Sequence, residues 1–219
     1  LLHELSHALV GRAQGIPVSA ITLFVFGGMA HTEKDPERWR AELWMALVGP
    51  LTSLALGVIF IVLANLMAPG VEMSADDPRE ALSQLGPVAT LLTWLGPINI
   101  LLGLFNLVPG FPLDGGRVLR AALWGITGSL RQATRWASRA GQGFAWVLIA
   151  SGVLMMLGQE VPVFGRGVVG GLWLAFIGWF LNSAALMSYR QLLVRESLEE
   201  VPVSRVMSTE LTTVHPETT

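Results

Sequence analysis

The sequence predicts an all-α polytopic membrane protein that carries a small membrane-associated β-hairpin. Apolar residues make up 52% of the 219 positions and charged residues only 14%, against roughly 25% charged in an ordinary globular chain. Helices need roughly 20 apolar residues to cross the hydrocarbon core of a bilayer. Four runs of about this length or longer contain no Asp, Glu, Lys or Arg, at residues 43–71, 81–113, 141–159 and 167–189.

Gly, Pro and charged residues divide the chain into predicted helices and strands. Residues 1–13 are predicted to be the end of a helix, and because no start signal precedes Leu1 we expect a truncated N-terminal span. The stretch SAITLFVFGGMAH is rich in β-branched and aromatic residues, which predicts a hairpin turning at Gly27-Gly28. A short basic helix, RVLRAALWG, follows the Pro-rich stretch VPGFPLDGG. The complete spans are predicted at residues 41–67, 85–108, 140–157 and 167–188.

The distribution of charge predicts the orientation in the membrane. Twelve of the 14 Lys and Arg residues would lie on one side, and the other side would keep only Arg79 and Arg166. By the positive-inside rule the first side is cytoplasmic, so we expect a plasma (inner) membrane protein whose first helix ends at the cytoplasmic face. The net charge of −2 gives no reason to expect a nucleic-acid partner, and the absence of Cys excludes thiolate metal ligands.

The first helix contains the pattern H-E-x-x-H, as His3, Glu4 and His7. Residues four apart lie on the same helix face, so the two imidazoles can bind one Zn²⁺ ion while Glu4 borders that face. A polar surface helix can match this pattern by chance. Here the surrounding residues are apolar, and ionisable side chains in a membrane helix are costly without a function, which favours a metal site.

Catalytic zinc sites usually have three protein ligands, so a third ligand is needed. Asp114 is favoured because it follows a predicted span, between the helix-breaking Pro112 and the flexible Gly115-Gly116. Asp114 could instead be an N-cap of the following helix. The other candidates for the third ligand are His31, Glu33, Glu72, Glu80 and His215.

Three segments together resemble the site-2 protease family of intramembrane zinc metalloproteases: HELSH at 3–7, GPLTS at 49–53 and LFNLVPGFPLDGGRVLR at 104–120. The segment FGGMAH resembles the β segment of that family. The resemblance implies that His3, His7 and Asp114 bind zinc and that Glu4 is the catalytic base. It further implies a place near the substrate for Asn106, a small-residue packing motif at Gly49 and Ser53, and a hairpin at Gly27 and Gly28.

The tail VPVSRVMSTELTTVHPETT resembles the first strand and turn of a cystathionine-β-synthase-type (CBS) domain. Such domains commonly bind adenine nucleotides, which the complete CBS region would then do here. We therefore expect a metalloprotease domain over residues 1–195 and the start of a truncated CBS domain over 200–219.

The implied function is a zinc-dependent endopeptidase that cleaves a transmembrane or juxtamembrane segment of a substrate protein within the lipid bilayer. One alternative is a metal transporter, which would need polar residues along several spans, and residues 43–71 and 141–159 offer almost none. A second alternative is a catalytically inactive metal-binding scaffold, which has no need of a base such as Glu4 beside the metal.

Overall fold

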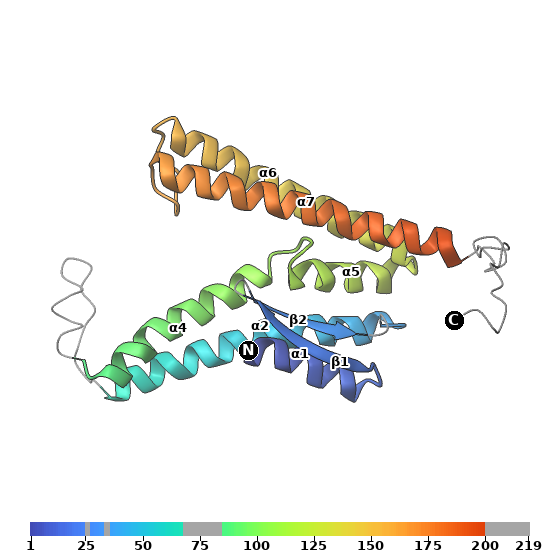
Figure 1. Cartoon of the computed structure of the whole chain (residues 1–219), viewed down its shortest axis with the longest axis horizontal. Helices are drawn as coiled ribbons and strands as arrows, with labels where there is room; N and C mark the ends of the chain where they lie inside the picture. Colours follow the sequence, from blue (N-terminus) through green and yellow to red (C-terminus); the bar gives the residue numbers. More distant parts are fainter. Residues whose placement is uncertain (25–26, 33–35, 68–84, 200–219) are drawn as a thin grey trace, which may run out of the picture.

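The computed structural model describes residues 1–24, 27–32, 36–67 and 85–199. Within them the chain forms six helices and one hairpin, with α1, α2 and α4 grouped together, α5 beside them, and α6 and α7 forming a long antiparallel pair (Figure 1). The bounds are α1 Leu2–Ala13, β1 Val18–Phe24, β2 Gly27–Thr32, α2 Trp39–Met67, α4 Pro87–Asn106, α5 Asp114–Thr127, α6 Leu130–Met156 and α7 Val168–Glu199.

Four of these helices are long and apolar enough to cross a membrane, which confirms the prediction of an integral membrane protein with four complete spans. They are α2, α4, α6 and the part of α7 over Val168–Val194. Large apolar side chains cover their outer surfaces, as expected where lipid rather than water is the solvent. Helix α7 runs to Glu199, past the predicted end at residue 188, because no Gly or Pro interrupts residues 189–199.

The hairpin is present, but its glycines do not form the turn. Strands β1 and β2 pair antiparallel, and the register places Phe24 opposite Gly27 and Leu23 opposite Gly28. Both glycines therefore belong to β2, and the prediction that the chain turns at Gly27-Gly28 is wrong. The ladder uses backbone N–H and C=O groups, which glycine carries like any other residue, so a glycine pair can continue a strand.

The segment between α4 and α5 is packed tightly from two sides. A side chain at Gly115 would overlap the carbonyl oxygens of Leu107 and Val108, and one at Gly141 of α6 would overlap the carbonyl oxygen of Phe111. The Phe111 N–H donates a hydrogen bond of 3.3 Å to the Ala137 carbonyl of α6. Glycine is required for this close approach of backbone to backbone, and the contacts fix the point at which α5 begins.

Candidate metal centre

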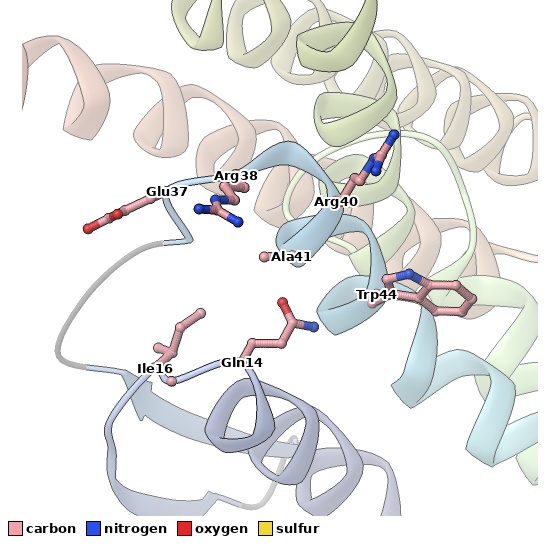
Figure 2. A pocket seen from close by; sticks show the side chains of 8 residues that line it. Gln14, Ile16, Glu37, Arg38, Arg40, Ala41 and Trp44 are labelled. Atoms are coloured by element: carbon pink, nitrogen blue, oxygen red, sulfur yellow. The ribbon is translucent and has the colours of Figure 1, made fainter.

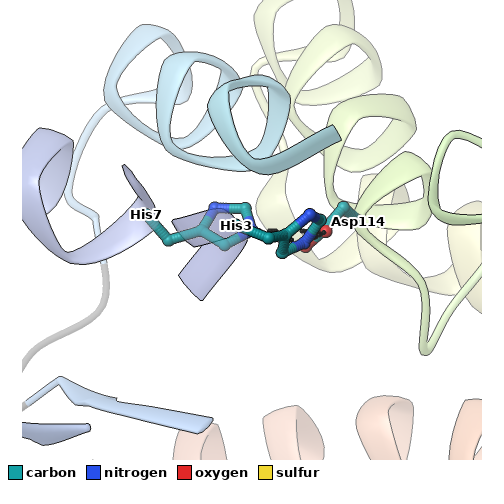
Figure 3. A group of neighbouring side chains, drawn as sticks. All are labelled: His3, His7 and Asp114. Carbon is teal, nitrogen blue, oxygen red and sulfur yellow. Dashed lines mark hydrogen bonds and ion pairs between the residues drawn. The ribbon is translucent and has the colours of Figure 1, made fainter. Parts of the chain in front are cut away.

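Three ligand-type side chains from two helices converge at one point (Figure 3). His3 and His7 lie one turn apart on α1, and Asp114 is the first residue of α5. The Nε2 atoms of the two histidines are 3.2 Å apart. Asp114 Oδ2 lies 3.1 Å from His3 Nε2 and 3.3 Å from His7 Nε2. Asp114 follows the two histidines by more than a hundred positions in sequence, yet the three potential ligand atoms lie in contact.

The second nitrogen of each imidazole is held by helix α2. His7 Nδ1 donates a hydrogen bond of 2.5 Å to the Met45 carbonyl oxygen, and His3 Nδ1 lies 2.9 Å from Ser53 Oγ. A carbonyl can only accept, so the proton of a neutral His7 sits on Nδ1 and the lone pair on Nε2 faces the cluster. Partners of this kind fix the tautomer and the ring orientation of a metal-binding histidine.

Gly49 makes room for both imidazoles. It lies on α2 between Met45 and Ser53, and a Cβ atom at this position would overlap His7 Nε2 and approach His3 Nε2 to 2.8 Å. The backbone of α2 therefore forms one wall of the cluster. The Gly and Ser of the GPLTS segment were expected to serve helix packing, and the structure places both directly against the histidines.

Asp114 does not act as a helix cap. The N-cap of α5 is Leu113, and no side chain makes a capping hydrogen bond there. The Asp114 carboxylate instead faces the histidines of α1. Burial alone would raise the pKa of Asp114, but the imidazoles of His3 and His7 beside it lower that pKa below its usual range. A lowered pKa favours the carboxylate form, which is the form that binds a metal.

The spacing of the three donor atoms fits a tetrahedral zinc ion. Zn–N and Zn–O bonds are about 2.0–2.2 Å long, so two ligand atoms on a tetrahedron are about 3.3 Å apart. The three measured separations are 3.1, 3.2 and 3.3 Å. Two imidazole nitrogens and one carboxylate oxygen are also a donor set that zinc accepts at catalytic sites, with a fourth position left open.

The remaining predicted residues are not among the three that converge, and several lie outside the described residues. Glu4 is partly buried on α1, next to His3. Asn106 is the last residue of α4, and its amide donates 3.0 Å to the Leu102 carbonyl of the same helix. The backbone of His31 lies in β2. Four candidates for the third ligand fall outside the described residues, namely Glu33, Glu72, Glu80 and His215.

A cavity of about 630 Å³ lies elsewhere, between the end of α1 and the start of α2 (Figure 2). Gln14, Arg38 and Trp44 are among its lining residues, and none of the three cluster residues is. Gln14 follows His3 by 11 positions, which is about 16 Å along a helix. The cavity is therefore distinct from the metal centre.

Comparisons with known proteins identify the relatives of this chain. The sequence model of Peptidase family M50 matches residues 1–82 and 67–148. Rip3 of Mycobacterium tuberculosis, assigned as a zinc metalloprotease, is 40% identical over 208 residues, which are 95% of this chain and 48% of Rip3. The protein sll0528 of Synechocystis sp., with the same assignment, is 42% identical over 198 residues, 90% of this chain and 46% of its own.

A solved structure has the same overall arrangement. The Site-2 Protease from Methanocaldococcus jannaschii superposes with a TM-score of 0.58 at 25% identity, over 98% of this chain and 76% of that chain. The chain spans about half the length of the curated relatives it matches. Since the family match extends over residues 1–148, more than half of the chain, this membrane protein belongs to Peptidase family M50.

Proposed function

We propose that the protein is a zinc-dependent intramembrane endopeptidase that cleaves a transmembrane or juxtamembrane segment of a substrate protein. The observation that carries the proposal is the convergence of His3 Nε2, His7 Nε2 and Asp114 Oδ2 at zinc-like spacing in a protein with four spanning helices. The zinc metalloprotease assignments of Rip3 and sll0528 support it.

His3, His7 and Asp114 would hold the ion, and α2 keeps the two imidazoles in place through Met45 and Ser53. Bound zinc supplies a Lewis acid that acidifies water at neutral pH and polarises a peptide carbonyl. The Glu4 carboxylate, next to His3 on α1, accepts a proton from the attacking water and then delivers it to the leaving amine.

Two further parts of the chain would handle the substrate. Asn106 lies at the end of α4, and rotation of its side chain away from Leu102 would free its amide to donate a hydrogen bond to the carbonyl oxygen as negative charge develops there. The β1–β2 hairpin lies against α1, with Gly27 and Gly28 in β2, and an extended substrate segment would add to it as a further strand.

The proposed domain division and membrane orientation rest on the amino-acid sequence. Residues 1–195 form the protease domain, with the zinc site near the cytoplasmic face of the plasma (inner) membrane, as the positive charges predict. Residues 200–219 lie outside the described residues, and their resemblance to the start of a CBS domain supports the proposal that a complete CBS region would bind an adenine nucleotide.

The test compares the parent protein with Glu4→Gln and Asp114→Asn, all purified in detergent. Zinc content is measured by atomic absorption, and cleavage is measured on a model single-span substrate. We expect one zinc ion per parent chain, retained in Glu4→Gln with cleavage lost, and most of the zinc lost in Asp114→Asn. Full cleavage by Glu4→Gln would remove Glu4 as the base. Zinc binding without cleavage of any substrate by the parent would favour a scaffold.

A further inference from the structure

Glu42 is a fully buried acidic side chain that the proposed chemistry does not use. It lies in the first turn of α2 and is 1% exposed. Arg120 of α5 donates from Nε to Glu42 Oε1 at 2.6 Å and also bonds it through Nη2, while Arg117 Nε lies 3.8 Å from the same oxygen. Burying a carboxylate is destabilising unless it is paired in this way, so we asked what the buried pair contributes to the protein.

Arg120 connects three parts of the protein. Its guanidinium carbon lies 5.2 Å from the centre of the Phe111 ring, in the segment that precedes α5. Phe111 is itself buried, and its N–H is bonded to α6. Arg120 is therefore held between the Glu42 carboxylate on α2 and an aromatic ring that is anchored on α6.

Both partners of this ion pair are close in sequence to the metal centre. Glu42 precedes Met45 by one turn on α2, and the Met45 carbonyl holds His7. Arg117 and Arg120 follow Asp114 by three and six positions, so they lie about one and two turns from it along α5. The ion pair thus joins the helix that orients the histidines to the helix that supplies the carboxylate.

Small rotations of α5 would disturb the metal site. Side chains extend about 5–6 Å from a helix axis, so a rotation of about 10° would move the Asp114 carboxylate by about 1 Å. Metal–ligand distances tolerate only about 0.2 Å. The close backbone contacts at Gly115 determine where α5 begins. The hydrogen bond from Arg120 to Glu42, two turns further along α5, restrains the rotation of the helix about its axis.

We propose that Glu42 is a positioning residue for the zinc site, which acts through Arg120 to set the rotation of α5 and so the place of Asp114. The inference rests on the proposed function, because it requires that the cluster binds zinc. The competing explanation is that the pair merely holds the helices together. A buried ion pair can often be replaced by apolar side chains without loss of stability. Such a replacement should leave zinc binding unchanged if the pair only holds the helices together, and should weaken zinc binding if the pair positions Asp114.

The experiment uses the purified protein in detergent and two variants, Glu42→Gln and the double variant Glu42→Leu/Arg120→Met. Gly152→Ala is the control for lost stability, since an added Cβ at Gly152 would lie 2.7 Å from the Ala175 nitrogen in the α6–α7 contact, away from the Phe111 anchor. Three quantities are measured: the zinc dissociation constant by chelator competition, the visible spectrum of the Co²⁺-substituted protein, and the midpoint of thermal unfolding without metal.

We expect both Glu42 variants to bind zinc about tenfold or more weakly, the size of effect typical for outer partners of metal ligands, and to show an altered Co²⁺ spectrum. The double variant should do so with a near-normal unfolding midpoint, and Gly152→Ala should keep the parent zinc affinity although its unfolding midpoint falls. Parent affinity and spectrum in both Glu42 variants would overturn the proposal. So would a loss of zinc affinity in Gly152→Ala as large as that in the Glu42 variants, since affinity would then only follow stability. A parent protein that binds no zinc would instead overturn the proposed function.

Discussion

Replacing Gly49 with alanine tests the metal centre with a single methyl group. In an ordinary helix interior this change stabilises the helix by about 1 kcal/mol. Here the new Cβ would lie 2.8 Å from His3 Nε2, whereas ordinary contacts begin at 3.4 Å, a shortfall of about 0.6 Å. The overlap with His7 Nε2 is greater still. Because metal–ligand distances tolerate only about 0.2 Å, at least one imidazole must leave its position.

We therefore expect Gly49→Ala to bind zinc at least about 10–100-fold more weakly, with helical content unchanged. Chelator competition measures the affinity, and circular dichroism in detergent measures the helical content. Gly143→Ala is the control, because an added Cβ on that face of α6 meets nothing within 4 Å. Parent-like zinc affinity in Gly49→Ala would refute the assignment of this face of α2 to the metal centre.

Three further outcomes are expected. Ser53→Ala removes the bond to His3 Nδ1 and should weaken zinc binding about tenfold in a chelator titration; an unchanged titration curve would mean that Ser53 does not orient the ring. Zinc at about 100 times its dissociation constant should stabilise the parent by about 2.7 kcal/mol in thermal unfolding, and Asp114→Asn should lose most of that gain. Gly152→Ala places a Cβ 2.7 Å from the Ala175 nitrogen in the α6–α7 contact, so unfolding should become easier by about 1–3 kcal/mol while zinc affinity stays the same.

The spans could be predicted from the sequence because a bilayer leaves the chain few choices. A segment in lipid must satisfy its backbone internally, so long charge-free runs become helices, as α2, α4, α6 and α7 do. The hairpin was predicted from its composition, but the position of Gly27 and Gly28 within it was not. Glycine is compatible with a turn and with a strand end, and only the register distinguishes them.

The metal centre was predictable only in part. The i, i+4 spacing placed His3 and His7 on one helix face, and the position of Asp114 after a span favoured it among six candidates, before the resemblance to site-2 proteases implied the same three ligands. The role of Met45 could not be found, because it acts through a main-chain carbonyl that every residue carries. For Ser53, the spacing of four from Gly49 was a usable signal, since it places a hydroxyl and a gap on the same face of α2.

One face of α2 connects the separate parts of the site. Glu42, Met45, Gly49 and Ser53 are spaced by three, four and four residues, and all four are buried. In that order they contact Arg120 of α5, His7, both histidines, and His3. The ligands of the metal centre come from α1 and α5, so these two helices must be held in a fixed relative position. This face of α2 contacts both of them. Leu51 is the control, because it lies on another face of α2 and is 49% exposed. Leu51→Ala should leave the zinc affinity unchanged, whereas substitutions of the four buried residues should lower it.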